Sequence, residues 1–222
     1  MATSVVWTWA LAAAGGAHAP SLHDYRIPEN TCTAENLQPF TEALGLQAFE
    51  ADPGVVLRSR TLDHVSCSLF GTQSAGDGWT AQYTATVTVD LHKKTDPRAE
   101  FEDAGRLQDD TLALASQGTY ATTTAVGVTR PVAHLGDLAF TTLSDTRQTI
   151  RVLDGGAVIS LSIDGTNQWQ GPGRAPAADG AAQRPAVADT KFLRPALVPA
   201  MRQLMRSLAA APAEESGAAS AT

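Results

Sequence analysis

The two cysteines are the side chains with the most definite chemistry. Cys32 and Cys67 are far apart in the sequence, form no CxxC pair and have no pair of histidines nearby, so they do not fit a zinc site. Two cysteines in an exported chain usually pair. We therefore expect a disulfide that joins the start of the first helix to an early strand. Two buried free thiols in a cytosolic protein are the alternative.

The other ionisable side chains match no catalytic or metal-binding motif. The five histidines are scattered, and no two have the spacing of metal ligands. His64 and Cys67 would point to opposite faces of a strand, so they would not form a Cys–His pair. The segment 71–76 has the wrong spacing for a nucleophile elbow and predicts a turn. Neither phosphate-binding glycine motif is present. We expect no metal, no cofactor and no catalytic residue.

One long loop carries residue types that often bind partners. Residues 165–189 are rich in Gly, Pro and Ala and include Trp169, Gln170 and Arg174. Exposed Trp and Arg are common at binding hot spots, and loops of this length often carry function. We expect a partner-binding loop here, or else an insertion with Trp169 anchored on the core.

Gly136 and Asp137 form a second feature between two predicted elements. A glycine before a strand is typical of a tight turn at an unusual backbone angle. We expect the pair to be a structural turn.

The elements that position these residues follow from hydrophobic patterning. From Tyr83 to Leu91 apolar residues alternate with Thr and Asp, which indicates a strand with one buried and one polar face. Asp154-Gly155-Gly156 between two apolar segments predicts a hairpin turn. Helices are expected from Thr33 to Leu44, from Pro97 to Gly118 and over 191–208, and strands over 55–62, 64–70, 79–91, 120–129, 137–143 and 148–163.

These elements predict an α+β fold in the order α-β-β-β-α-β-β-β-α. We expect a single, mostly antiparallel sheet of about six strands, with the helices packed mainly on one face. The domain spans residues 32–209 and follows a tether over 20–31. Residues 210–222 are small, polar and aperiodic and predict a disordered tail.

Residues 1–19 contain an apolar segment that is too short to span a bilayer. Its length suits a signal peptide, and Ala17-His18-Ala19 resembles a cleavage site, but no basic residue precedes the segment. A signal peptide with a mis-set start, part of a membrane anchor, and a buried N-terminal helix remain open. The first two place the domain on the extracytoplasmic side of the membrane, anchored or secreted.

Composition excludes several classes of protein. The net charge of −7, with 16 Lys and Arg against 23 Asp and Glu in 222 residues, argues against a nucleic-acid binder. No apolar run is long enough for a multi-pass membrane protein.

Several features together resemble a family of exported domains. They are Cys32 before a helix ending in Leu44-Gly45, Cys67 in an early strand, the segment 136–140 (Gly-Asp-Leu-Ala-Phe), and the hairpin over 150–161. This pattern resembles small exported domains of actinobacterial envelope proteins and lipoproteins of unknown function. More distantly it resembles the extracellular sensor domains of mycobacterial serine/threonine kinases. The chain lacks a lipid-attachment cysteine and a kinase domain.

Three functions follow as hypotheses. The first is a non-enzymatic extracytoplasmic domain that binds an unknown envelope ligand or protein, as a monomer by default. The second is a carrier of an apolar, lipid-like envelope molecule, which needs a closed apolar cavity between helix and sheet. The third is an envelope hydrolase, which needs a cleft where histidines and acidic residues converge.

Overall fold

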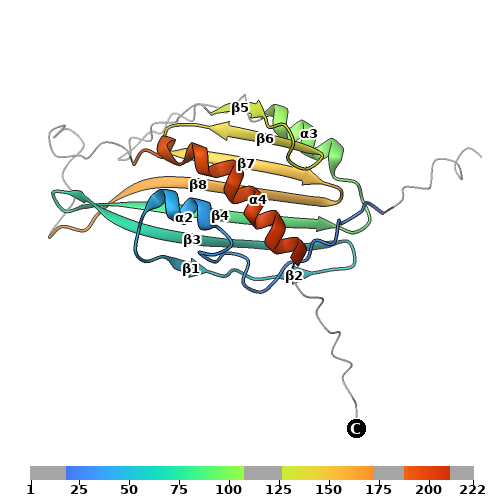
Figure 1. Cartoon of the computed structure of the whole chain (residues 1–222), viewed down its shortest axis with the longest axis horizontal. Coiled ribbons are helices and arrows are strands. Elements are labelled where there is room, and N and C mark those ends of the chain that lie inside the picture. The colour runs from blue at the N-terminus through green and yellow to red at the C-terminus, as the bar shows by residue number, and fades with distance from the viewer. Residues whose placement is uncertain (1–18, 108–126, 173–187, 211–222) are drawn as a thin grey trace, which may run out of the picture.

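The structure, a computed structural model, describes residues 19–107, 127–172 and 188–210 (Figure 1). The described parts contain three α-helices and eight strands, with four strands between each helix and the next. Their bounds are α2 Gln38–Leu44, β1 Glu50–Asp52, β2 Leu57–Arg58, β3 Leu62–Gly76, β4 Trp79–His92, α3 Arg98–Leu107, β5 Val128–Pro131, β6 Leu138–Leu143, β7 Arg147–Asp154, β8 Ala157–Trp169 and α4 Arg194–Ala210, with a 3₁₀ turn at Lys191–Leu193.

All eight strands belong to one antiparallel sheet. The strand order is β1-β3-β4-β8-β7-β6-β5, and β2 pairs with β3 beside β1. The predicted α+β class and antiparallel sheet are therefore confirmed. The strand count of about six was too low, because each run between helices holds four strands where three were expected.

One face of the sheet forms the core. Alternate residues of the central strands, such as Val87, Ile150 and Leu161, are fully buried. Helices α2 and α4 lie across this face (Figure 1), and Leu197, Met201 and Leu204 of α4 are buried there. We call this face the core face and the other one the polar face.

Helix α3 lies on the polar face. Its Phe101 ring contacts Phe140 of β6 and the guanidinium of Arg151 on β7. Both partners alternate along their strands with the buried residues Ala139 and Val152, which point to the core face. Two of the three described helices thus share one face, and α3 is the exception.

Two long strands continue through segments that the sequence predicted to be non-regular. The predicted turn at 71–76 is part of β3, in which Gly71 pairs with Tyr83. A Cβ on Gly71 would lie 2.6 Å from Leu46 Cδ1, so glycine is here an interior strand residue where bulk is excluded. Residues 165–169 extend β8, so the predicted loop over 165–189 was placed five residues too early.

The predicted tether over 20–31 packs against the domain. Tyr25, Ile27 and Thr31 are buried, and the amide of Arg26 donates a hydrogen bond to the carbonyl of Leu208 in α4 (3.0 Å). This segment is therefore part of the folded unit. No helix within the described ranges is long and apolar enough to cross a membrane.

The helix ends also differ in detail from the predictions. Helix α2 begins after Leu37, and the predicted cap Thr33 instead accepts a hydrogen bond from the Asn36 amide in the preceding turn (3.1 Å). Helix α4 continues through Pro199, and Phe192, in the 3₁₀ turn before it, is 48% exposed. The predicted elements over 108–118 and 120–126, the segment 1–18 and the tail over 211–222 lie outside the described residues.

Candidate functional site

The cysteines form the predicted disulfide. Cys32 and Cys67 are joined by an S–S bond of 2.04 Å, and their Cα atoms are 5.8 Å apart. Both residues are almost fully buried. The bridge attaches the segment before α2 to strand β3 on the core face.

The structure describes only part of the predicted partner-binding loop, which includes Trp169 and Gln170. Trp169 is the last residue of β8 and packs edge-on against Trp79 of β4, with ring centroids 5.4 Å apart. Gln170 is exposed, and its backbone N–H donates a hydrogen bond to the Gly78 carbonyl (2.8 Å). Arg174 lies outside the described residues.

Gly136 and Asp137 form a tight turn against the β7–β8 hairpin. Gly136 has a φ of +58°, and a Cβ there would lie 2.6 Å from the carbonyl oxygen of Leu153. The Asp137 carboxylate accepts a hydrogen bond from the Gly155 amide (3.0 Å) and pairs with Arg98 of α3 (3.5 Å). Asp137 thus connects α3 to the hairpin.

The polar face carries a row of hydroxyl groups in register across six strands. Three pairs in this row are hydrogen-bonded, at 3.2, 3.2 and 2.9 Å. All six residues are half-buried: Ser68, Thr86, Ser162, Thr149, Thr142 and Thr129. Strand β4 supplies the threonines that its sequence predicted for a polar face.

A pocket lies between α3 and the polar face, next to this row. Its volume is about 350 Å³. We call it the α3 pocket, and its walls are Leu62, Asp90, His92, Pro97, Glu100, Phe101, Ala104, Arg151 and Val158. Strand register brings these residues together, because Asp90 of β4 is opposite Val158 of β8, and Ser160 of β8 is opposite Arg151 of β7.

Arg151 is the main cation of the α3 pocket. Its guanidinium carbon lies 5.4 Å from the centroid of the Phe101 ring, which is itself 3% exposed. Burial lowers the pKa of Arg151 from its ordinary value, and the nearby Asp90 carboxylate opposes that shift. Within the described residues the guanidinium makes no hydrogen bond and no ion pair.

Asp90 already has a partner. The Nδ1 atom of His64 on β3 lies 2.6 Å from Asp90 Oδ1, and the two side chains are 34% and 28% exposed. Where the structure describes the chain, no hydroxyl is bonded to the other ring nitrogen of His64. The His–Asp pair therefore has no serine or threonine nucleophile attached to it there.

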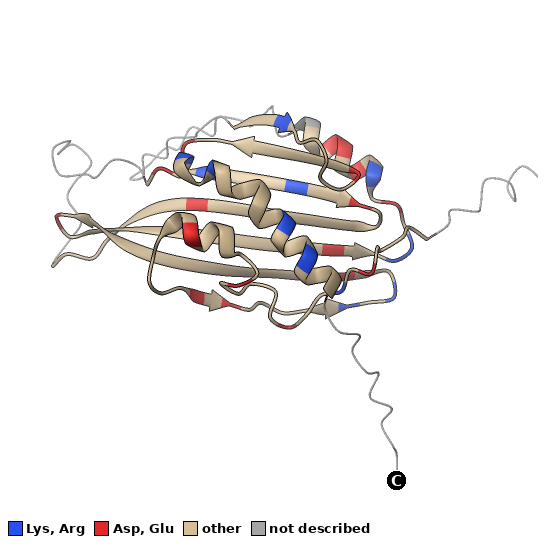
Figure 2. Ribbon diagram, viewed as in Figure 1, with Lys and Arg blue, Asp and Glu red and all other residues tan. Residues whose placement is uncertain are grey.

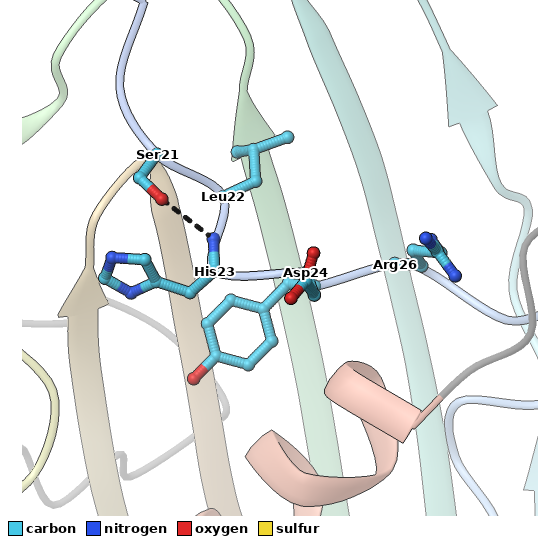
Figure 3. Close-up of a pocket in the computed structure, with 6 residues that line it drawn as sticks. Ser21, Leu22, His23, Asp24 and Arg26 are labelled. Carbon is cyan, nitrogen blue, oxygen red and sulfur yellow. Dashed lines mark hydrogen bonds between the residues drawn. The ribbon is translucent and has the colours of Figure 1, made fainter.

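A second pocket, of about 500 Å³, is formed by the N-terminal segment 21–26. Figure 3 shows the amide of His23 bonded to the Ser21 hydroxyl (3.2 Å), where the segment runs across the strands beside the end of α4. His23 Nδ1 lies 3.0 Å from Asp154 Oδ1, and the Tyr25 hydroxyl donates to Asp154 Oδ2 (2.6 Å). These contacts attach the segment to the β7–β8 hairpin.

The Tyr25 hydroxyl is held in its protonated form. Burial raises the pKa of Tyr25 well above its ordinary value, and the hydrogen bond to Asp154 and the negative charge of that carboxylate raise it further. A phenol with a raised pKa is a stable hydrogen-bond donor at neutral pH. The cluster is thus suited to fastening the segment to the hairpin.

Sequence reasoning did not identify Arg151, Asp90 or Phe101 as site residues. The available signal was an arginine within the apolar strand 150–153, where a charge is unusual and needs a reason. Charged residues are sparse on the central strands and more frequent at their ends and on the helices (Figure 2).

Comparison with known proteins gives no relative. No protein-family model, no curated protein and no solved structure matches the chain. Within residues 19–107, 127–172 and 188–210, no group of three or more His, Cys, Asp or Glu residues is placed to hold a metal ion.

Proposed function

We propose that this protein is a non-enzymatic, extracytoplasmic ligand-binding domain of a bacterial envelope protein, and that it binds its ligand in the α3 pocket. The disulfide between Cys32 and Cys67 supports an oxidising compartment.

The unpaired Arg151 guanidinium carries the proposal of a ligand. A partly buried cation normally has an acidic partner or a shell of acceptors, because removing a charge from water is costly. Arg151 has an aromatic ring on one side, and its donors are unused in the described residues. A small molecule that enters the pocket could accept hydrogen bonds from this guanidinium.

The two alternative functions have less support. A carrier would hold its apolar molecule between α4 and the sheet, but buried side chains such as Leu197 and Met201 occupy that layer. The α3 pocket contains charged side chains, which do not suit a lipid-like cargo. A hydrolase would need a nucleophile beside the His64–Asp90 pair, and the described residues supply none there.

Ligand retention tests the proposed function. The full, oxidised chain is dialysed against a small-molecule extract of bacterial envelope, and retained molecules are identified by mass spectrometry. We expect at least one molecule to be enriched by the wild type and lost in Arg151→Gln. Arg147→Gln is the matched control, because Arg147 lies on the same strand, is paired with Asp164 and is outside the pocket.

A second pocket variant distinguishes loss of binding from loss of the fold. Ala104→Phe fills the pocket from α3 without removing a charge, and circular dichroism checks that each variant keeps its fold. The proposal is wrong if the wild type enriches nothing, or if both pocket variants retain the same molecules as the wild type.

The location is tested by labelling thiols in cells that express the full chain. When cells are quenched in acid and the chain is denatured, Cys32 and Cys67 should resist alkylation until a reductant is added, because they are paired in an oxidising compartment. Thiols that are alkylated without a reductant would contradict an extracytoplasmic location.

A further inference from the structure

We propose that the α3 pocket selects a small zwitterion of the amino-acid type, with its carboxylate on Arg151, its ammonium facing Asp90 and Glu100, and its side chain against the apolar wall. This inference rests on the proposed function and narrows it to one class of ligand.

The guanidinium of Arg151 is arranged to receive a carboxylate. Arginine presents its donors in a planar fork that matches the two oxygens of a carboxylate. The contact with Phe101, at 5.4 Å from the ring centroid, restricts the orientation of that fork. Asp90, the acid of the pocket that influences Arg151 electrostatically, already accepts a contact from His64 at 2.6 Å. The guanidinium donors therefore remain available to a ligand.

The remaining charges of the pocket argue against a simple anion. The titratable side chains on its walls are Arg151, Asp90, Glu100 and His92, with His64 behind Asp90. Two carboxylates near one guanidinium would repel a phosphate or a dicarboxylate. The same carboxylates would attract an ammonium group. A ligand with one group of each sign satisfies both ends of the pocket.

The rest of the wall is apolar. Leu62 belongs to β3, Val158 to β8 and Ala104 to α3, and Pro97 directly precedes α3. The volume of about 350 Å³ lies at the lower end of small-molecule sites. An aliphatic side chain would cover this wall and exclude water from the charged contacts. Free leucine has the three required parts and is the probe for the test.

The test compares leucine with derivatives that each lack one charge. Binding of leucine, leucinamide and N-acetyl-leucine to the full, oxidised chain is followed by calorimetry and by NMR shifts of the pocket residues. We expect leucine to bind and each derivative to bind at least about tenfold more weakly, because each loses one charge-assisted contact. Arg151→Gln should weaken leucine by a similar factor, and Arg147→Gln should leave it unchanged.

The acidic side of the pocket has its own variants. Asp90→Asn and Glu100→Gln should weaken leucine but not N-acetyl-leucine, whose amine carries no charge. Two variants are used because Asp90→Asn also changes the hydrogen bond between Asp90 and His64, whereas Glu100 is exposed on α3. If both variants leave the preference for leucine over N-acetyl-leucine unchanged, the acidic residues do not recognise an ammonium group and the inference is overturned.

The failure of this inference differs from the failure of the proposed function. Equal binding of leucine and N-acetyl-leucine would show a site for simple carboxylates, which overturns the zwitterion and leaves a ligand-binding domain. Absence of leucine binding also overturns the zwitterion, and the dialysis experiment then decides whether the pocket takes another molecule. If dialysis retains nothing, the proposed function fails as well.

Discussion

At the scale of single residues, Gly155 determines the path of the N-terminal segment. It has a φ of +58° in the turn between β7 and β8, and its amide donates to Asp137. The carbonyl oxygen of Ser21 lies 2.1 Å from where a Cβ would be, and the next amide, of Gly156, donates to that oxygen (2.6 Å). The missing side chain thus lets another part of the backbone cross the hairpin.

We predict that Gly155→Ala destabilises the fold more than Gly45→Ala. Both glycines have positive φ, so each substitution should cost about 1–2 kcal/mol from the backbone alone. Only Gly155 has a backbone oxygen within van der Waals distance of the new Cβ, since nothing lies within 4 Å at Gly45. The total cost at Gly155 should exceed about 3 kcal/mol. Equal losses in urea unfolding would show that Ser21 can move aside freely.

We predict that the Tyr25 hydroxyl makes stability fall at alkaline pH. Burial and Asp154 raise the pKa of Tyr25 in the folded state, so above about pH 10 the folded chain holds a proton that the unfolded chain releases. Above that pH, the Tyr25 hydroxyl lowers the free energy of unfolding by up to about 1.4 kcal/mol for each further pH unit. The stabilisation from the Tyr25 hydroxyl is fully present below about pH 10. In urea unfolding between about pH 9 and about pH 11, Tyr25→Phe should show a shallower fall than the wild type. Identical slopes would contradict this role.

At the scale of elements, periodicity predicts single strands well and their neighbours poorly. The alternation from Tyr83 to Leu91 identifies β4 and its polar face, because one face packs on the core. Gly71 was misread, since a glycine in a strand is indistinguishable in sequence from one in a turn until Leu46 and Phe49 are seen beside it. The α3 pocket could not be predicted, because Asp90 and Arg151 meet only through the register of three strands.

The start of α4 is fixed by a buried polar network. Gln148 is fully buried at the start of β7, where its side-chain amide donates to Thr190 Oγ1 (2.9 Å) and to the Ser144 carbonyl. Arg194 donates to Gln148 Oε1 (3.0 Å) and to the Ser144 carbonyl (2.8 Å). One side chain thus connects the β6–β7 turn to α4.

We predict that Gln148→Leu lowers the free energy of unfolding by about 2–4 kcal/mol, because it removes the acceptor of Arg194 Nε and the donor to Thr190 Oγ1 at a fully buried position. Gln38→Leu on α2 is the control, since Gln38 is exposed and, among the described residues, its side chain is hydrogen-bonded only to Glu42. It should change stability by less than about 0.5 kcal/mol. Chemical denaturation of both variants checks the difference, and similar losses would rule the network out as a stabilising feature.

At the scale of the whole molecule, the two faces of the sheet differ in what they carry. The core face is closed by α2, α4 and the segment 20–31, and it supplies most of the buried apolar area. The polar face carries the hydroxyl row and the α3 pocket, with the ion pair from Arg98 to Asp137 connecting α3 to the hairpin. The buried core and the proposed binding pocket thus lie on opposite sides of one sheet, so a pocket variant should leave folding nearly intact.

The disulfide is the covalent connection between the layers of the core face, and its removal should be costly. It closes a loop between residues 35 positions apart, which corresponds to about 3–4 kcal/mol of unfolded-state entropy. We predict that the double variant Cys32→Ala/Cys67→Ala loses about that much unfolding free energy, since both sulfurs are buried and leave small voids besides. Reduced wild-type chain should unfold at nearly the same urea concentration as the variant. A variant as stable as the oxidised wild type would mean that α2 and the N-terminal segment stay on β3 through apolar contacts alone. Such a result would also remove the main physical reason for an oxidising compartment.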